Sequence, residues 1–193
     1  DTLDWIGLNY YYRFQVSFHP FYPRQVFLRQ TPSRDGIRGP GDTGEIWPEG
    51  LLEQIKWLYK ATGKPLYITE NGVPDPDDAI RPLHMVRSLR NVWKAVMHSY
   101  PVRGYFYWTL VDNFEWSEGY DPRFRFGLYA CDPISQERTA RPSATLYRDI
   151  CAANALDSET IRRAIPADEF DTLFPGVEVQ PRVTLLPREE SQL

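Results

Sequence analysis

The sequence has few cysteines, few histidines and no long apolar run, and each shortage argues against a class of protein. Its 193 residues include two cysteines and three histidines. The spacing of Cys131 and Cys151 matches no zinc site, and the histidines form no H-E-x-x-H pair. No apolar run approaches the ~20 residues that cross a bilayer. The sequence therefore predicts no metal, no other cofactor and no membrane partner.

Positive charge is also in short supply. The formal net charge is −4, and no stripe of lysine and arginine stands out, so nucleic acid is not expected as a partner. Free thiols and the lack of a signal peptide favour a reducing compartment, and we expect a cytoplasmic protein. The first residues already have the pattern of a strand and include no initiator methionine, so we also expect a piece of a longer chain.

Aromatic residues, in contrast, are abundant from the start of the chain. Phenylalanine, tyrosine and tryptophan make up 15% of it. Leu3–Tyr12 has the composition of a strand, in which side chains alternate between two faces. Every second residue from Trp5 to Tyr11 shares a face that mixes polar and aromatic groups, and the residues between them share an apolar face. This pattern suits a barrel strand with a functional C-terminal end.

The remaining chain alternates helices with strands. After a long connection at 14–47, the predicted elements are a helix opened by Pro48 and stopped by Gly63, a strand at Leu66–Thr69, a helix at Arg81–Ser99, a strand at Val102–Leu110 and a helix near Ser143–Asn154. This order predicts parallel strands joined by helices, either in a doubly wound sheet or in a (β/α)8 barrel. No glycine-rich phosphate-binding motif follows any strand, which weakens the first alternative.

The composition changes near residue 155. Beyond that point the chain becomes rich in proline and charge, and Pro166–Phe174 and Pro187–Leu193 have the composition of weakly ordered or surface-packed segments. We therefore predict a folded part at 1–154 and a C-terminal tail at 155–193 that is surface-packed or partly disordered.

Glu70 stands at the end of a short apolar strand, just before a tight Asn71-Gly72 turn. Barrel enzymes place reacting groups at this end of a strand. A glutamate there can act as a nucleophile, a base or a metal ligand, or it can cap the loop by accepting backbone N–H bonds. The motif by itself leaves these alternatives open.

A second segment, Gly104–Tyr120, combines aromatic and acidic side chains at the end of another strand. Glu115 beside Trp116 fits sugar binding, because a carboxylate accepts hydrogen bonds from hydroxyls and an indole packs beside a sugar ring. The alternative is an aromatic core strand followed by solvated acids.

These segments together resemble glycoside hydrolase family 1. Ile68–Gly72 resembles its I-T-E-N-G signature, Gly104–Tyr120 its last strand, Asn9–Tyr11 its N-Y-Y strand and Glu45–Gly50 the stretch before a barrel helix. The resemblance covers Asp4–Asn154 in the order of the family. It implies an α/β fold, a partial (β/α)8 TIM barrel containing the last three β/α units, strands six to eight. The implied activity is that of a retaining β-glycosidase of the β-glucosidase type.

The resemblance also implies roles for single residues. Glu70 corresponds to the nucleophile that forms a covalent glycosyl-enzyme intermediate, and Tyr11 to the tyrosine that orients it. The substrate-binding positions correspond to Trp108, Glu115, Trp116, Phe124 and, with a weaker claim, Asn9. An extra Arg-Phe pair leaves Phe124 and Phe126 as alternatives for one aromatic position. Glu115 would repel a phosphate, which favours a neutral β-glycoside as the substrate.

The largest departure from the family is an absent motif. The acid/base glutamate of the family lies in a T-x-N-E-P segment that this sequence lacks. Retention of configuration requires two carboxyl groups about 5–5.5 Å apart. We therefore expect the chain to be inactive alone and to need the N-terminal half of the barrel. Two alternatives remain: a noncatalytic sugar-binding half barrel, and one half of a split enzyme.

Overall fold

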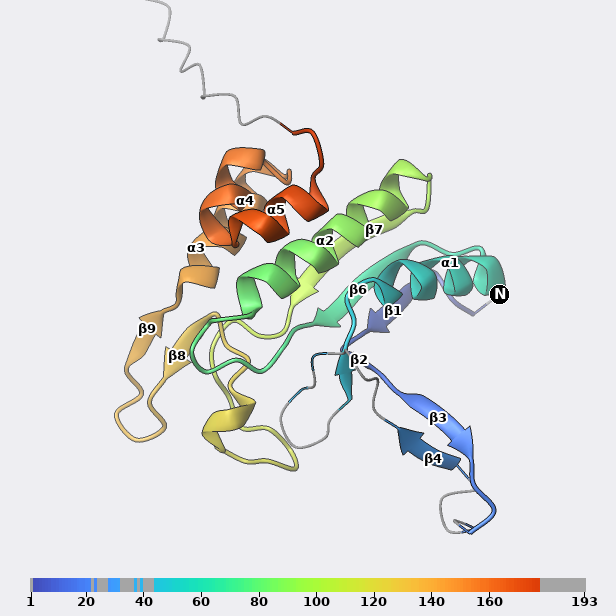
Figure 1. Ribbon diagram of the computed structural model, residues 1–193, viewed down its shortest axis with the longest axis horizontal. Coiled ribbons are helices and arrows are strands. Elements are labelled where there is room, and N and C mark those ends of the chain that lie inside the picture. The colour runs from blue at the N-terminus through green and yellow to red at the C-terminus, as the bar shows by residue number, and fades with distance from the viewer. Residues whose placement is uncertain are drawn as a thin grey trace, which may run out of the picture.

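The computed structural model describes residues 2–21, 23, 28–31, 37, 39 and 44–177 (Figure 1). The strands are β1 (Ile6–Asn9), β2 (Tyr12–Arg13), β3 (Gln15–Phe18), β4 (Leu28–Thr31), β5 (Glu45–Ile46), β6 (Leu66–Asn71), β7 (Val102–Tyr107), β8 (Tyr129–Cys131) and β9 (Arg138–Ala140). The helices are α1 (Gly50–Thr62), α2 (Arg81–Met97), α3 (Pro142–Ala153), α4 (Ser158–Ala164) and α5 (Ala167–Leu173), and a 3₁₀ turn, η3, covers Pro122–Phe124.

β1, β6 and β7 form one parallel sheet with β6 in the middle. The chain passes from β1 to β6 by way of α1, and from β6 to β7 by way of α2, which are the crossovers that parallel strands require. The order of the strands in the sheet therefore follows their order in the chain. Residues of α1 and α2 share one core cluster with β1 and β6, so both helices pack on the same face of the sheet. This arrangement fits a segment of a barrel.

The ends of the helices have local causes in the sequence. α1 ends where Gly63 adopts a left-handed conformation with φ 66°, and its N–H donates to the carbonyl oxygen of Tyr59 at 2.8 Å. Pro82 and Pro142 stand in the first turns of α2 and α3, where a missing N–H leaves no hydrogen bond unmade. Of these signals, Gly63 is the one that predicted a helix end from the sequence.

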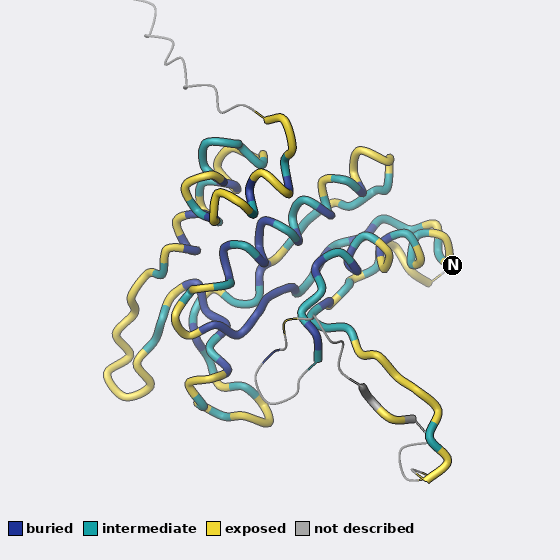
Figure 2. The backbone as a smooth tube through the Cα atoms, viewed as in Figure 1, coloured by how far each residue is buried: buried dark blue, intermediate teal, exposed yellow. Residues whose placement is uncertain are grey.

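Buried, intermediate and exposed residues all occur in the sheet (Figure 2), and the two faces differ in their burial. On the face beneath the helices, which we call the covered face, Leu66 and Ile68 of β6 are fully buried. Trp5 and Phe106, which lie on the opposite face, are 51% and 57% exposed. The ring edge of Trp5 meets Tyr67 with 5.2 Å between centroids. We call this opposite side the uncovered face; its residues are Trp5, Gly7, Tyr67, Thr69, Gly104 and Phe106.

The first predicted strand and the long connection differ from the expectation. The pairing of β1 with β6 shifts between Leu8 and Asn9, so the expected strand Leu3–Tyr12 is divided into β1 and β2. The connection 14–47 contains a β3–β4 hairpin and β5 among its described residues. All four residues of β3 are exposed, so the hairpin has no alternation of buried and exposed positions for the sequence to reveal. β7 also ends at Tyr107, three residues earlier than predicted.

The described part of the expected tail is helical. α4 and α5 add Ile161, Phe170 and Leu173 to the core cluster that also contains Met85 of α2 and Leu146 of α3. For Pro166–Phe174 the sequence left weak order and packing on the surface as alternatives. The structure has α5 in this segment, because Pro166 precedes its first turn and lets a helix begin there. The expectation for Pro187–Leu193 lies outside the described residues.

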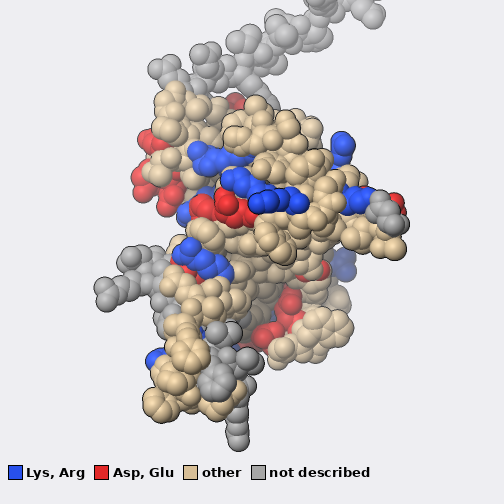
Figure 3. All heavy atoms as spheres, turned by 90° about the vertical axis from the view of Figure 1, so that its right-hand side faces the viewer, with Lys and Arg blue, Asp and Glu red and all other residues tan. Residues whose placement is uncertain are grey.

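The surface carries charges of both signs. On the side of the molecule drawn in Figure 3, lysine and arginine lie beside aspartate and glutamate and form no large area of one sign. Arg87 and Glu49 form one such pair, with 2.6 Å between Nη2 and Oε1. Among the described residues, no helix has both the length and the apolar character needed to cross a membrane.

Candidate active site

The predicted catalytic residues come together at the C-terminal ends of the parallel strands. Glu70 is the fifth residue of β6, Tyr11 follows β1, and Trp108 follows β7. Backbone bonds fix this edge of the sheet: Tyr10 N–H donates to Glu70 O at 2.9 Å, and Trp108 N–H donates to Asn71 O at 3.0 Å. Barrels built from parallel strands carry their reacting groups at this edge.

Glu70 and Tyr11 are in direct contact. The Tyr11 hydroxyl donates a hydrogen bond to Oε2 of Glu70 at 2.8 Å. Burial, the bond to Glu70 and the charges of Glu70 and Glu115 raise the pKa of the Tyr11 phenol well above its ordinary value. The phenol therefore stays protonated at neutral pH and acts as a donor to the carboxylate.

Glu70 opens into a pocket of about 390 Å³. The pocket contains every predicted catalytic and substrate-binding residue except Asn9. The lining residues are Tyr11, Tyr12, Glu70, Trp108, Asn113, Phe114, Glu115, Trp116, Glu118, Phe124 and Phe126. Aromatic rings and carboxylates thus line the same pocket, a composition that suits sugar recognition.

Glu115 and Trp116 lie on a tight loop after β7. Glu115 and Gly119 exchange backbone hydrogen bonds of 2.9 and 2.7 Å, and Gly119 has φ 65°, which favours glycine. The indole Nε1–H of Trp108 donates to Oε1 of Glu115 at 3.4 Å. Partial burial, together with nearby carboxylates that include Glu118, raises the pKa of Glu115. Trp116 is 94% exposed, so its ring is free to receive a ligand.

Both phenylalanines that the sequence left as alternatives reach the pocket. Arg125 between them is extended, with φ −85° and ψ 106°, so Phe124 and Phe126 point to the same side. The Phe126 ring meets the edge of Tyr11 with 6.0 Å between centroids. Asp121 stabilises the turn that carries Phe124 by accepting the N–H of Arg123 at 2.9 Å.

Asp112 fixes the segment that carries these rings to the outer helices. Its Oδ1 accepts the N–H of Gly127 at 2.8 Å, and its Oδ2 accepts a guanidinium N–H of Arg141, at the start of α3, at 3.0 Å. The side chains of Asp112 and Arg141 are only 2% and 10% exposed. Removing one partner of such a buried pair leaves an uncompensated charge.

Asn9 lies beside the pocket and does not line it. Its Oδ1 accepts a hydrogen bond from the Thr69 hydroxyl at 2.6 Å, next to Glu70 in the chain. Asn71 was missed by the sequence reasoning as a supporting residue, although it stands in the same motif. It is fully buried, donates to Tyr10 O at 2.7 Å and accepts from the Tyr105 hydroxyl at 2.8 Å.

The sequence reasoning missed four further lining residues: Tyr12, Asn113, Phe114 and Glu118. Each is a direct neighbour, or stands within two residues, of a position that was named. Proximity in the sequence was therefore the available signal. In the part of the chain that the structure describes, no group of three or more His, Cys, Asp or Glu side chains is placed to hold a metal ion.

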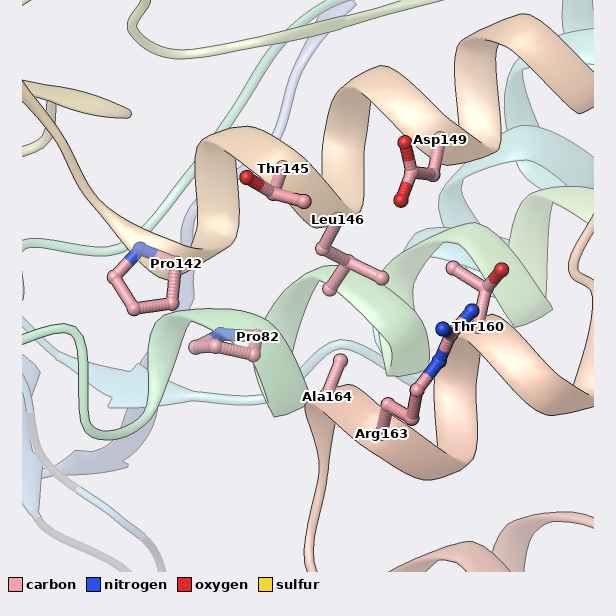
Figure 4. Close-up of a pocket in the computed structure, with 8 residues that line it drawn as sticks. All are labelled: Pro82, Pro142, Thr145, Leu146, Asp149, Thr160, Arg163 and Ala164. Carbon is pink, nitrogen blue, oxygen red and sulfur yellow. The ribbon is translucent and has the colours of Figure 1, made fainter.

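A second hollow of about 420 Å³ lies in the outer helical layer (Figure 4). It is lined by Pro82, Pro142, Thr145, Leu146, Asp149, Thr160, Arg163 and Ala164. Its two charged side chains already have partners, because Asp149 pairs with Arg148 at 2.8 Å and Arg163 with Glu159 at 3.7 Å. The pocket at Glu70 is therefore the better candidate for chemistry.

Comparisons with known proteins agree with this geometry. The sequence matches the profile of glycosyl hydrolase family 1 over residues 1–156. A β-galactosidase from Pyrococcus woesei is 38% identical over 172 residues, which are 79% of this chain and 32% of the relative. β-Glucosidase A from Thermotoga maritima is 33% identical over 167 residues, 81% of this chain and 36% of the relative. A solved β-glycosidase from Pyrococcus horikoshii matches with a TM-score of 0.74 and 35% identity, covering 86% of this chain and 38% of that one.

The chain belongs to glycosyl hydrolase family 1, which confirms the resemblance drawn from its motifs. It spans about a third of the length of the curated relatives that it matches. The structural neighbours are family 1 glycosidases with the TIM-barrel fold, and the parallel sheet described above corresponds to part of that barrel.

Proposed function

We propose that this chain supplies strands six to eight and the nucleophile of a retaining β-glycosidase. The observation that carries the proposal is the contact between Tyr11 and Glu70, at strand ends that open into a pocket with Glu115 and Trp116. The family membership and the β-galactosidase and β-glucosidase relatives support a β-glycoside as the substrate.

In the proposed reaction, a carboxylate oxygen of Glu70 attacks the anomeric carbon of the sugar. A bond forms between that oxygen and the anomeric carbon while the bond to the aglycone oxygen breaks, which gives a covalent glycosyl-enzyme ester. Water then releases the sugar with retained configuration. Tyr11 orients the attacking carboxylate through its hydrogen bond. Glu115 binds sugar hydroxyls, and Trp108 and Trp116 pack against the ring.

The departing aglycone oxygen also needs a proton. We propose that this proton comes from a glutamate on other barrel strands, which a preceding segment or a separate chain provides. Alone, the chain would therefore fail to hydrolyse glycosides whose leaving group is basic. A leaving group that departs without a proton removes this requirement and allows the nucleophile to be tested separately.

A 2,4-dinitrophenyl 2-deoxy-2-fluoro-β-glucoside meets that condition. Dinitrophenolate leaves unprotonated, and the fluorine slows the later attack by water, so the ester accumulates. We expect mass spectrometry to find one fluoroglucosyl group on Glu70. Glu70→Gln should abolish the labelling, whereas Glu118→Gln, a matched change in the same pocket, should leave the label on Glu70. Labelling of another carboxylate, or none in the wild-type chain, contradicts the proposal.

A second measurement tests the need for the rest of the barrel. The chain is mixed with the N-terminal two-thirds of a family relative, and hydrolysis of an aryl β-glucoside is followed. We expect turnover only in the mixture, and only while Glu70 is intact. Steady turnover by the chain alone contradicts the proposed division of the two carboxyl groups.

Two other functions make different predictions. A noncatalytic sugar-binding half barrel would bind glucose equally well after Glu70→Ala, and it would not become labelled. One half of a split enzyme would recover activity only with a natural partner chain that carries an N-E-P segment. We further propose a cytoplasmic, reducing location, which agrees with the free thiols of Cys131 and Cys151.

A further inference from the structure

The Glu45–Gly50 segment has a family-like sequence, yet none of its residues lines the pocket. It contacts the stretch Tyr10–Arg13 instead, which carries the phenol that meets Glu70. This contact gives the segment a role that the proposed chemistry alone does not explain.

Tyr11 belongs to no strand of its own. β1 ends at Asn9 and β2 begins at Tyr12. β2 pairs with β5 over two residues only, Tyr12 with Ile46 and Arg13 with Glu45. So short an antiparallel ladder is only marginally stable by its backbone bonds. Side-chain contacts on either side of Tyr11 must therefore hold it in place.

Before Tyr11, the backbone is held by Tyr10. Its hydroxyl donates to the carbonyl oxygen of Trp47 at 2.6 Å, and its N–H donates to Glu70 O at 2.9 Å. The Asn71 side chain donates to Tyr10 O at 2.7 Å. These bonds join the strand end that carries Glu70 to the segment that contains Trp47.

After Tyr11, the backbone is held by Arg13. Its Nε and Nη2 donate to the two carboxylate oxygens of Glu45 at 2.8 and 2.6 Å. The guanidinium carbon also lies 4.1 Å from the ring centroid of Trp47. We call these three residues, Arg13, Glu45 and Trp47, the arginine clamp. These contacts require the planar guanidinium group of arginine. A lysine ammonium cannot form a bidentate contact with a carboxylate and does not stack on an indole ring.

We propose that Arg13 is a positioning residue, and that the arginine clamp holds the Tyr11 phenol against the Glu70 carboxylate. The proposal rests on the proposed function, since it concerns the nucleophile of that reaction. Arg13 touches neither the substrate pocket nor Glu70, so its effect on the site passes through the backbone of Tyr11.

The test replaces Arg13 with lysine, which keeps the charge and removes the fork and the stacking. Arg87→Lys is the matched control. Nε and Nη2 of Arg87 also contact a glutamate, at 2.8 and 2.6 Å from Oε1 of Glu49, and Arg87 and Arg13 are similarly exposed. The full chain is labelled with 3-fluorotyrosine, and the Tyr11 fluorine signal is assigned from its absence in Tyr11→Phe. Fluorine lowers the pKa of the phenol and brings its ionisation nearer to the pH range in which proteins stay folded.

We expect Arg13→Lys to raise the ionisation constant of the Tyr11 phenol about tenfold or more, because the phenol leaves the carboxylate and becomes more exposed. Arg87→Lys should leave that constant unchanged even if it lowers the melting temperature equally. An unchanged constant in Arg13→Lys, or an equal change in both variants, overturns the proposal.

The fluorine measurement needs neither sugar nor turnover, so it separates this inference from the proposed function. If Glu70 is never labelled by the fluoroglucoside but the ionisation constant changes as expected, the clamp stands and the proposed function fails. If Glu70 is labelled and the constant does not change, the proposed function stands and the clamp fails.

Discussion

The covered and uncovered faces belong to the same three-stranded sheet, yet they differ in how far their side chains are buried. Beneath the helices, Leu66 and Ile68 are fully buried and share a core with α1 and α2. On the other side, Trp5 and Phe106 keep about half of their surface. The covered face of the sheet is therefore buried in a core with the helices, whereas the uncovered face stays largely exposed.

This difference separates stability from chemistry. The buried apolar area lies between the sheet and the helices, and it is the main source of folding free energy. The proposed catalytic and binding groups lie at the strand ends, where Glu70, Glu115 and Trp116 line an open pocket. Substitutions in the core should therefore change the free energy of unfolding, and substitutions at the strand ends should change the chemistry.

The largest expected contrast is between two phenylalanines, Phe170 in the helical core and Phe106 on the uncovered face. Phe170→Ala should lower the free energy of unfolding by about 3–5 kcal/mol, because the ring is fully buried. Phe106→Ala should cost less than about 1 kcal/mol in the isolated chain, since its ring is more than half exposed. Urea unfolding of both variants measures the contrast, and equal losses would remove it.

Adding the N-terminal part of a relative would sharpen the same comparison. If that part covers the inward face, the cost of Phe106→Ala should rise in the mixture while the cost of Phe170→Ala stays the same. An unchanged cost for Phe106→Ala would mean that the added part does not cover this face.

A smaller effect is expected from His84, which is buried in α2. Burial, and then the positive charges of Arg87 and Arg81, lower its pKa to about 3. The unfolded chain takes up a proton below pH ~6.5 and the folded chain does not, so this residue lowers stability as the pH falls. The loss should be about 1.4 kcal/mol per pH unit between pH ~6 and ~4.

His84→Met removes this titration with a side chain of similar size. Unfolding free energies of the wild-type chain and the variant should diverge as the pH is lowered from ~7 to ~4. Curves that stay parallel over this range would show that His84 takes up its proton in the folded chain.

The smallest effect belongs to the pocket. The pKa of Glu115 is raised by burial, so its contribution to stability is present below pH ~4 and is lost as the pH rises through the folded-state pKa. Glu115→Gln should therefore raise the melting temperature at pH 7 by about 1–2 °C, after allowance for solvent screening. The gain should disappear below pH ~4. Glu137→Gln, a change at an exposed position, serves as the control, and an equal gain there would refute the explanation.

Local signals predicted much of the helical layer. Gly63 ends α1 as predicted, and the helix predicted at Arg81–Ser99 is found as α2 at Arg81–Met97. Composition was less informative at Pro166–Phe174, where it left weak order and packing on the surface as alternatives. What decides α5 is the burial of Phe170 and Leu173 against helices far away in the chain, and no local pattern reports that contact.

The site shows the same division between local and distant information. The strand-end position singled out Glu70 as a candidate, the pairing with Trp116 singled out Glu115, and the resemblance supplied Tyr11. The sequence could not choose between Phe124 and Phe126, because it does not reveal that Arg125 between them is extended. The structure places both rings in the wall of the pocket, and the correspondence of either ring to the aromatic position of the family stays a prediction.

Asp112 connects the wall of the pocket to the outer helical layer. One carboxylate holds Gly127, next to Phe126 of the pocket wall, and also Arg141, at the start of α3. The shape of the pocket wall at Phe126 is therefore coupled to the packing of α3. A substitution that changes how α3 packs can therefore alter the shape of the pocket, and a substitution in the pocket wall can alter how firmly α3 is held.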